Sequence, residues 1–277
     1  MRIANVRGRL TTFVDGEAVD IAERSNGQFG PDPMSAFADW NALAAWGASI
    51  GAIGGGEIDQ TTLGAPVPTP TQVFAIGMNY LAHANEGPFG PPPAPAVFTK
   101  FPGCIVGADH VTAIPAETTD YEVELVLAIG REASHVAQAD AWSYVAGLMI
   151  GQDFSERTMQ RAGNAPQFSL AKSYTGFGPT GPWLVTLDEF SNPDDLRLST
   201  TIGGEILQDS RTSDLIFDVP YLIEYLSAVL PLQVGDLIFT GTPSGVGSAR
   251  TPPRWLRSGE TVVSAVEDIG ELHSRLV

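Results

Sequence analysis

The segment that most constrains the fold is Asp120–Gly130, in which two glutamates lead into an unbroken apolar run. Five apolar residues after Glu124 predict a strand that is covered on both faces. Side chains alternate along a strand, so Glu122 and Glu124 project from the same face. Two like charges on a covered strand are costly unless a cation neutralises them, and Mg²⁺ or Mn²⁺ would bind such oxygen ligands. The alternative is a strand end whose glutamates face water.

The rest of the chain is typical of a β-rich globular protein. Its 277 residues include 30 glycines and 21 prolines, which indicate many turns. Apolar runs between turns predict strands near 73–76, 125–129, 183–187, 237–240 and 261–264, and helical patterns occur near 33–50, 138–147, 154–163 and 217–229. Asp15-Gly16 predicts a hairpin within residues 1–24. We expect a small N-terminal domain over residues 1–65 and a catalytic domain over residues 71–277.

Charge and cysteine content exclude several classes of function. The net charge of -17 at pH 7 argues against a nucleic-acid partner, and an anionic substrate would need local positive charge. Lysine occurs only as Lys100 and Lys172, so both attract attention. The single cysteine, Cys104, rules out a disulfide within the chain and is interpreted as a buried small residue. No apolar run is long enough for a signal peptide or a membrane span, which predicts a cytoplasmic protein without a membrane partner.

A third carboxylate, Asp153, ends the next apolar run and precedes a helical pattern. Asp153 and Glu156 fit a helix N-cap with a capping box. On that helix, Arg157 and Gln160 would lie on the same face as Asp153. A carboxylate, a guanidinium and an amide that point one way could hold a metal and grip a carboxylic acid. The sequence leaves the capping and the functional interpretations open.

Three further segments carry polar or reactive groups. His83 and Glu86 would be neighbours on a helical turn, either as a general-base pair or as a solvated surface pair. The proline-rich stretch after Glu86 suggests a mobile loop that closes over a site. Lys172 lies among apolar and small residues. The glycine-dense turn Thr240–Gly247 could hold an anion through its N–H groups and hydroxyls, or could simply connect strands.

Together, and in this order, these segments resemble the fumarylacetoacetate hydrolase family. The family pattern has GxNYxxHxxE, a strand with ExE, D-x-S-x-R-x-x-Q, a lysine segment ending in G-P-W, and G-D-x-I-x-T-G-T-P-x-G-V-G. The matching motifs begin at Gly77, Glu122, Asp153, Lys172 and Gly235. The similarity covers roughly residues 71–277. Thr175 and Gly203 depart from the pattern, at places where aspartate and asparagine are usual.

The resemblance implies an α+β, β-rich fold: a mixed β-sheet roll with a small N-terminal α/β domain, usually in a homodimer. It implies that Mg²⁺ or Mn²⁺ is held by Glu122, Glu124 and Asp153. It implies catalytic roles for Lys172 and for His83 with Glu86, the latter two on a lid that orders over the substrate. The implied substrate contacts are Tyr80, Arg157, Gln160 and Thr242.

The implied function is metal-dependent hydrolysis of a C–C bond in a small anionic diketo acid, such as an acylpyruvate. The reaction would pass through a metal-bound enolate, with the His83–Glu86 pair activating water. Such substrates arise in the catabolism of aromatic compounds or cyclic ketones. A decarboxylase of a 2-keto acid such as oxaloacetate, or a keto–enol or diene-dioate isomerase, would use the same metal site. A non-catalytic ligand-binding protein is a further alternative, but it would have lost a catalytic position, and none is lost.

Overall fold

The computed structural model describes residues 1–86 and 90–277, so the start of the predicted lid loop, residues 87–89, lies outside the described residues. The strands are β1 (Arg2–Val6), β2 (Arg9–Val14), β3 (Glu17–Asp20), β4 (Leu63–Gly64), β5 (Val73–Gly77), β6 (Ala96–Thr99), β7 (Ile105–Val106), β8 (Val111–Thr112), β9 (Thr119–Asp120), β10 (Val123–Ile129), β11 (Val145–Gln152), β12 (Ser155–Glu156), β13 (Gly178–Val185), β14 (Arg197–Ile202), β15 (Glu205–Arg211), β16 (Leu237–Phe239), β17 (Thr261–Val266) and β18 (Gly270–Leu276). The helices are α1 (Ile21–Arg24), α2 (Trp40–Ser49), α3 (Leu81–Ala84), α4 (Arg157–Gln160) and α5 (Val219–Ser227), with short 3-10 turns between elements.

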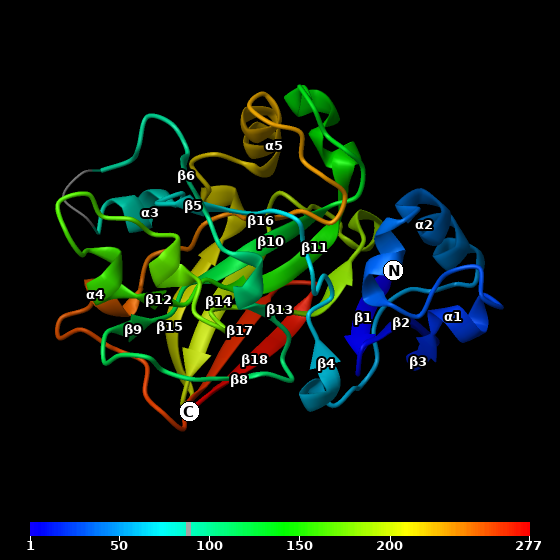
Figure 1. The fold of residues 1–277 in the computed structure, drawn as a ribbon, viewed down its shortest axis with the longest axis horizontal. Coiled ribbons are helices and arrows are strands. Elements are labelled where there is room, and N and C mark those ends of the chain that lie inside the picture. Colours follow the sequence, from blue (N-terminus) through cyan, green and yellow to red (C-terminus); the bar gives the residue numbers. More distant parts are fainter. Residues whose placement is uncertain (87–89) are drawn as a thin grey trace.

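In the described part of the chain, two large sheets carry the fold and a third, two-stranded sheet pairs β9 with β12 (Figure 1). Among the described residues, the larger sheet has 11 strands in the order β3-β2-β1-β13-β11-β10-β16-β5-β6, with β4 paired to β1 and β7 to β13. The smaller sheet has five strands in the order β15-β14-β17-β18-β8 within the same described ranges. Among the strands that the structure describes, three pairs are parallel, namely β16 with β5, β13 with β7 and β18 with β8, whereas the long central pairs are antiparallel. The predicted α+β, strand-rich fold with mixed sheets is therefore confirmed.

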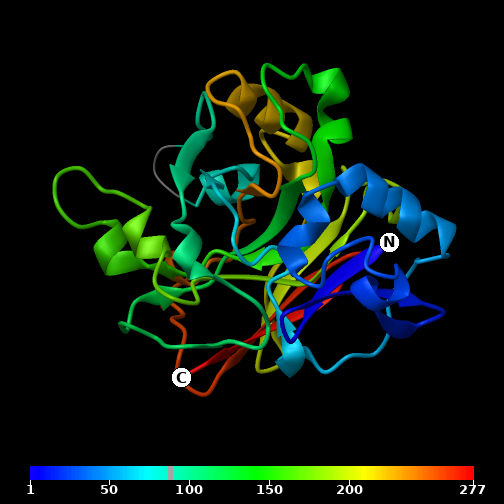
Figure 2. The ribbon, with the colours of Figure 1, turned by 45° about the vertical axis from the view of Figure 1, so that its right-hand side comes forward.

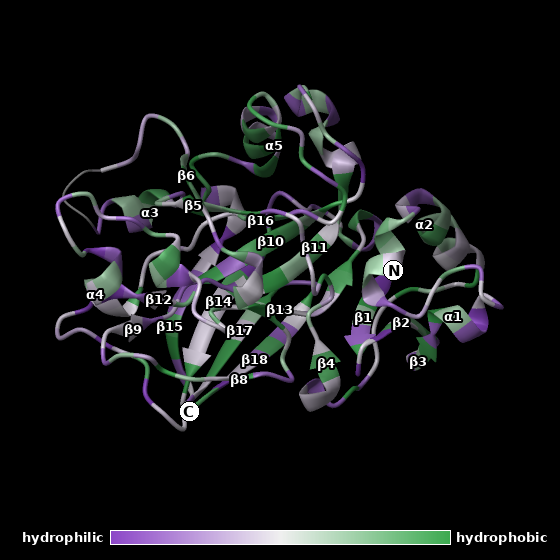
Figure 3. Ribbon diagram, viewed as in Figure 1, coloured by the Kyte–Doolittle hydropathy of each residue, from purple (hydrophilic) through white to green (hydrophobic). Residues whose placement is uncertain are grey.

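Strand β10 lies inside the larger sheet, as its apolar run predicts. It pairs with β11 on one side and with β16 on the other, and all of its residues are buried. Leu125 belongs to one apolar core and Val126 to another, because successive side chains enter opposite faces of the sheet. This hydrophobic centre is visible around β10 and β11 in Figure 3. Glu122 and Glu124 share the alternation of Val126, so they point into the protein interior.

A glycine in the neighbouring strand keeps these strands closely packed. Gly151 of β11 lies opposite Glu124 in the register of the pair. A Cβ atom at Gly151 would lie 2.5 Å from Cγ2 of Val126 and 2.7 Å from the ring of Phe239. Protein interiors are closely packed, so relieving such an overlap would displace neighbouring groups and destabilise the fold. The strands that carry the carboxylates therefore require glycine at position 151.

The N-terminal strands extend the larger sheet (blue in Figure 2). The predicted hairpin consists of β2 and β3, with Asp15 at φ 51° and Gly16 at φ 82° in its turn. Strand β1 pairs with β13 of the predicted catalytic region, in which Arg2 lies opposite Val185. Because backbone pairing runs across the two regions, the division into domains at residues 65–71 stays a prediction.

Three predicted helices were too long. The pattern over 33–50 divides into the 3-10 turn Pro33–Phe37 and α2, because the Asp39 side chain caps α2 by accepting from the N–H of Ala42. The pattern over 138–147 forms only a 3-10 stretch, Gln138–Tyr144, before β11 begins. The pattern over 154–163 contains only the single turn α4. In each case strand pairing or a local cap overrides helix periodicity.

Helix α5 fulfils the prediction for residues 217–229. Asp218 caps it by accepting from the N–H of Tyr221, and Val219, Leu222, Ile223 and Leu226 form its buried stripe. This stripe packs into the same apolar core as Leu125. Cys104 is buried and unpaired, as expected. Within the described ranges, none of the helices combines the length and the hydrophobicity that crossing a bilayer requires.

Candidate active site and metal centre

Three buried carboxylates meet where β10 begins and β11 ends. The antiparallel register brings these ends together, and the N–H of Asp153 donates to the carbonyl of Glu122 at 2.9 Å. Glu122, Glu124 and Asp153 each offer an oxygen atom, and these atoms lie within 4.8 Å of one another. Their exposed fractions are 6 %, 1 % and 0 %. Three hard oxygen donors at this spacing fit a divalent cation such as Mg²⁺ or Mn²⁺.

The three carboxylates differ in how the protein neutralises them. Burial by itself would raise the pKa of Glu122, but the ammonium of Lys172 and the guanidinium of Arg157 outweigh it and hold that pKa at about 2. Burial, reinforced by the neighbouring Asp153 and Glu122, raises the pKa of Glu124 well above its usual range. The Glu124 carboxylate accepts a hydrogen bond from the N–H of Gly241 at 2.7 Å. Glu124 is therefore the carboxylate whose charge a bound cation would stabilise most.

Both lysines of the chain lie at this centre. Lys172 Nζ is 2.8 Å from Glu122 Oε2 and 2.6 Å from Asp153 Oδ2. Lys100 Nζ is 2.6 Å from Asp153 Oδ1 and also donates to the backbone carbonyls of Lys172 and Phe177. The sequence predicts a role for Lys172 but assigns none to Lys100. The scarcity of lysine in the sequence was the signal that pointed to Lys100.

Replacing Lys100 by methionine is expected to destabilise the fold by about 3 kcal/mol, because it leaves the buried carboxylate of Asp153 without this counter-charge. The Lys100 side chain is fully buried, and its removal would leave Asp153 Oδ1 and the carbonyl oxygen of Lys172 without a donor, whereas the carbonyl of Phe177 keeps the N–H of Phe154. Urea denaturation with EDTA present measures this change. Arg197→Met, at the exposed ion pair with Asp209, is the control and should have little effect. Equal stability of Lys100→Met and wild type would show that the Lys100 contacts contribute nothing.

The predicted cap at Asp153 is wrong. The chain forms the short strand β12 before α4 begins, and Glu156 caps that helix by accepting from the N–H groups of Thr158 and Met159. Pairing of β12 with β9 overrides the capping-box pattern. Asp153 is thereby free to face Glu122 and the lysines. Asp153 joins the cluster with Glu122 and Glu124 because it follows the buried strand β11, and not because it lies on a helix face.

Arg157 connects the carboxylates to the predicted substrate contacts. Its Nη2 lies 2.6 Å from Glu122 Oε1, its Nε 2.8 Å from Asp120 Oδ2 and its Nη1 2.9 Å from Gln160 Oε1. These protein contacts use three of its five N–H groups, so a substrate could bind only the remainder. Asp120 was assigned no role from the sequence. Extending the alternation of Glu122 and Glu124 by one step would have placed it on their face.

The glycine-dense turn after β16 binds anions, and those anions are carboxylates of the protein itself. Backbone N–H groups of the turn donate to Glu124 from Gly241 at 2.7 Å, to Glu86 from Gly245 at 2.8 Å and to Asp120 from Gly247 at 2.7 Å. The Thr242 hydroxyl donates to the carbonyl of Val123 at 2.8 Å and accepts from Gln208 at 2.8 Å. One turn therefore positions one carboxylate of the cluster, the partner of His83 and the partner of Arg157.

His83 and Glu86 are neighbours, as predicted, because α3 forms one helical turn at this place. His83 Nδ1 lies 2.6 Å from Glu86 Oε2. The other oxygen of Glu86 is held by Gly245, so the carboxylate is fixed from both sides. The carboxylate orients the imidazole ring and leaves Nε2 as the ring nitrogen available to a substrate or to water.

Asn79 fixes the chain immediately before α3. Its Nδ2 donates to the carbonyls of Phe217 at 2.9 Å and Thr240 at 2.7 Å, and its Oδ1 accepts from the N–H of Phe217 at 2.9 Å. Gly241 packs so tightly beneath it that a Cβ would lie 2.7 Å from Asn79 Cβ, and its φ of +103° strains any other residue. Asn79 therefore joins α3 to the glycine-dense turn.

Asn79→Ala is expected to destabilise the protein by about 2–4 kcal/mol, because one buried and two part-buried backbone groups lose their partners. Chemical denaturation gives the free energy of unfolding. Asn41→Ala, at an exposed position of α2, is the matched control and should unfold like wild type. A loss no larger than that of Asn41→Ala would contradict the role given to Asn79.

A cavity of about 80 Å³ joins most of the predicted site residues. His83, Arg157, Gln160, Lys172 and Thr242 line it together with Glu122. This space is far below the ~300–1,000 Å³ of pockets that enclose drug-sized ligands, so it suits a small molecule. Tyr80 is 1 % exposed and is not among the lining residues, so its predicted substrate contact remains a prediction.

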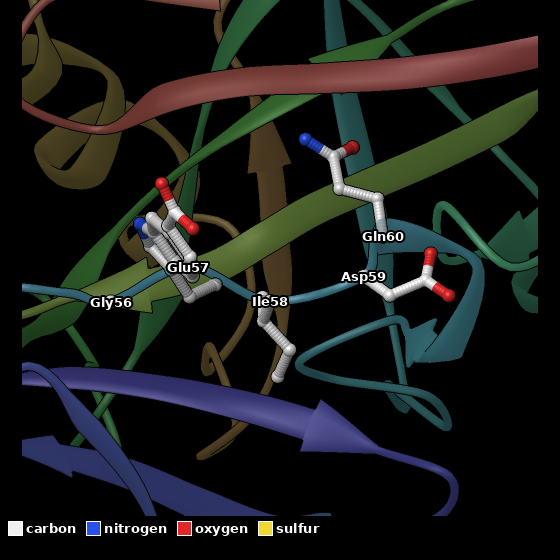
Figure 4. A pocket seen from close by; sticks show the side chains of 6 residues that line it. Gly56, Glu57, Ile58, Asp59 and Gln60 are labelled. Carbon is white, nitrogen blue, oxygen red and sulfur yellow. The ribbon is translucent and has the colours of Figure 1, made fainter.

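A larger hollow of about 530 Å³ shares no lining residue with this cavity (Figure 4). It lies between residues 56–60 and Trp183 and presents the carboxylates of Glu57 and Asp59. Gln60 is engaged with β18, since it donates to the carbonyl of Glu271 and accepts from the N–H of His273. The hollow has no lysine, arginine or histidine in its lining to complement an anionic keto acid. The smaller cavity is therefore the candidate active site.

Comparison with known proteins identifies the family of this chain. The family model described as "Fumarylacetoacetate (FAA) hydrolase C-terminal" matches residues 72–277. The oxaloacetate tautomerase FAHD2A, mitochondrial, of Bos taurus is 37 % identical over 220 residues, which cover 79 % of this chain and 70 % of that protein.

Two solved structures are similar in fold and sequence. The crystal structure of a protein from Mycobacterium smegmatis provisionally classed as HpcE has a TM-score of 0.94 and 45 % identity, and the match covers 100 % of this chain and 99 % of that one. Fumarylpyruvate hydrolase from Pseudomonas aeruginosa, solved with Mn²⁺ and pyruvate, has a TM-score of 0.68 and 32 % identity, covering 75 % of this chain and 90 % of that one. The chain belongs to the fumarylacetoacetate hydrolase family.

Proposed function

We propose that this chain is a divalent-metal-dependent hydrolase that cleaves a C–C bond in a small diketo acid of the acylpyruvate type. The observation that carries the proposal is the contact of His83 Nδ1 with Glu86 Oε2 at 2.6 Å, at a cavity that also contains Lys172. Activation of water needs a base, and cleavage needs a donor for the negative charge that develops. The cavity offers both groups within one small space.

The metal ligands of the proposal are Glu122, Glu124 and Asp153. Their buried oxygen atoms, within 4.8 Å of one another, form a donor set that suits Mg²⁺ or Mn²⁺. A bound ion would supply Lewis acidity toward the oxygen atoms of a 2-keto acid. The relative solved with Mn²⁺ and pyruvate supports this assignment.

The remaining steps use the side chains of this chain. His83 Nε2 takes a proton from water, which attacks the distal carbonyl, while Glu86 stabilises the resulting imidazolium. Lys172 and Gln160 donate to the oxyanion. The C–C bond breaks, its electron pair remains on the 2-keto acid fragment as an enolate, and that carbon then takes a proton. Acetylpyruvate would yield acetate and pyruvate.

Proton transfer without bond cleavage is the second candidate. The 37 % identity to an oxaloacetate tautomerase favours it, and the same His83–Glu86 pair could move a proton between the carbon and the oxygen of a keto–enol pair. Decarboxylation of a 2-keto acid would use the same metal ligands. From the resemblance we also propose that the chain acts as a homodimer in the cytoplasm.

Proton NMR of acetylpyruvate and of oxaloacetate, each incubated with the Mg²⁺-loaded protein, separates these reactions. The proposal expects equal amounts of acetate and pyruvate from acetylpyruvate, and no reaction after EDTA treatment. Accelerated enol-to-keto conversion of oxaloacetate, with acetylpyruvate intact, would replace hydrolysis by tautomerisation. Loss of CO₂ from oxaloacetate as the only reaction would replace it by decarboxylation.

A further inference from the structure

The lining of the small cavity combines polar and apolar groups. Charged and hydrogen-bonding side chains supply one part of the lining, here called the polar side, and Ile76, Gly77, Met78 and Phe168 supply the other, here called the apolar side. A keto acid would place its carboxylate and keto oxygen on the polar side, since burial without hydrogen bonds is costly. Its carbon tail would then face the apolar side.

Phe168 contributes the aromatic ring of the apolar side, and three contacts hold it. Its carbonyl accepts from the N–H of Lys172 at 3.1 Å. Its ring meets that of Phe98 edge-on, with centroids 5.4 Å apart and planes at 74°. A Cβ atom at Gly77 would lie 3.3 Å from Phe168 Cε2. The ring therefore cannot retreat from the cavity without displacing β5 or β6.

The turn that places Phe168 also places Lys172. The hydrogen bond between their backbones spans one turn, and Lys172 Nζ lies 5.3 Å from the centre of the Phe98 ring. Phe98 thus contacts both the ammonium and the Phe168 ring. Because both groups contact Phe98, the distance between the Lys172 ammonium and the Phe168 ring is fixed. This distance limits the length of the carbon tail in any acid that Lys172 binds.

We propose that Phe168 sets the substrate length, so that the site takes short 2-keto acids of about the size of oxaloacetate or acetylpyruvate and rejects longer ones. The proposal rests on the keto-acid site of the proposed function but not on which bond is broken. A methylene group gained or lost in an apolar pocket changes selectivity by roughly 10- to 200-fold, so a single ring can decide between short and long acids.

Binding, measured without turnover, tests this inference. Isothermal titration of the Mn²⁺-loaded protein with pyruvate, 2-oxopentanoate and 2-oxooctanoate gives three dissociation constants. Wild type should bind 2-oxooctanoate at least about tenfold more weakly than pyruvate. Phe168→Ala should reduce this ratio to below about threefold, and Phe168→Trp should increase it.

Local structure favours folding of these variants. Residues 161–167, which precede Phe168, are exposed and extend outward beside α4 (Figure 2). Phe168→Leu provides a milder change if the alanine variant unfolds. Leu170→Ala is the matched control, because Leu170 is 65 % exposed on the same segment and should keep the wild-type ratio.

Two results would overturn the length limit: equal binding of all three acids by wild type, or an unchanged ratio in Phe168→Ala and Phe168→Leu. Failure to bind any 2-oxo acid would overturn the length limit together with the keto-acid site. Selective binding of short acids without C–C cleavage would instead overturn hydrolysis and leave the role of Phe168 intact.

Discussion

His83→Ala is expected to lower kcat by about 10²- to 10⁴-fold, the usual contribution of a general base, while Mn²⁺ binding stays unchanged. The ring lies at the cavity, and its Nδ1 is fixed by Glu86 at 2.6 Å, but it is no ligand of the carboxylate centre. Steady-state turnover of acetylpyruvate and a Mn²⁺ titration measure the two effects separately.

The chain provides a matched control for this variant. His273 contacts Glu271 at 2.9 Å, so it has the same kind of carboxylate partner, but it is exposed and does not line the cavity. His273→Ala should keep the kcat of wild type. Equal activity of His83→Ala and wild type would remove His83 from the mechanism.

Glu124→Gln is expected to abolish the stabilisation that a divalent ion gives to wild type. At a metal concentration roughly 100 times Kd, binding adds about 2.7 kcal/mol, or roughly 5–10 °C in Tm for a protein of this size. The variant lacks one of three carboxylate ligands, so Mn²⁺ should leave its Tm unchanged. Differential scanning fluorimetry with Mn²⁺ and with EDTA measures the shift, and Glu205→Gln, at an exposed carboxylate, should respond like wild type.

The same variant should be more stable than wild type when EDTA removes the metal. The folded-state pKa of Glu124 is raised above its unfolded value by burial and by Asp153 and Glu122. Its unfavourable contribution is therefore absent at low pH and grows as pH rises through the unfolded and then the folded pKa. The advantage of Glu124→Gln should appear near neutral pH and disappear near pH ~4. A variant less stable than wild type at both pH values would contradict this account of Glu124.

The cluster of three carboxylates could be predicted because it depends on local rules. Alternation along β10 places Glu122 and Glu124 on one face, and a single antiparallel register adds Asp153. The single turn α3 likewise brings His83 to Glu86. Each of these contacts joins residues that are close in sequence or that belong to one pair of strands.

Contacts between distant segments could not be predicted in the same way. Lys100 reaches Asp153 across 53 positions of sequence, and Gly247 reaches Asp120 across more than a hundred. The helix predicted over 154–163 was lost to the pairing of β12 with β9, which no helical periodicity reveals. The positions of the carboxylates follow from local sequence patterns, whereas the groups that neutralise them come together only in the tertiary fold.

The most direct test of the proposed metal centre is a crystal structure of the protein soaked with Mn²⁺ and pyruvate, with anomalous diffraction to locate manganese. We expect an anomalous peak among Glu122, Glu124 and Asp153, with pyruvate beside it in the cavity lined by Lys172 and Thr242. Manganese bound elsewhere, with Glu122 and Asp153 still paired only with Lys100, Lys172 and Arg157, would contradict the proposed metal centre.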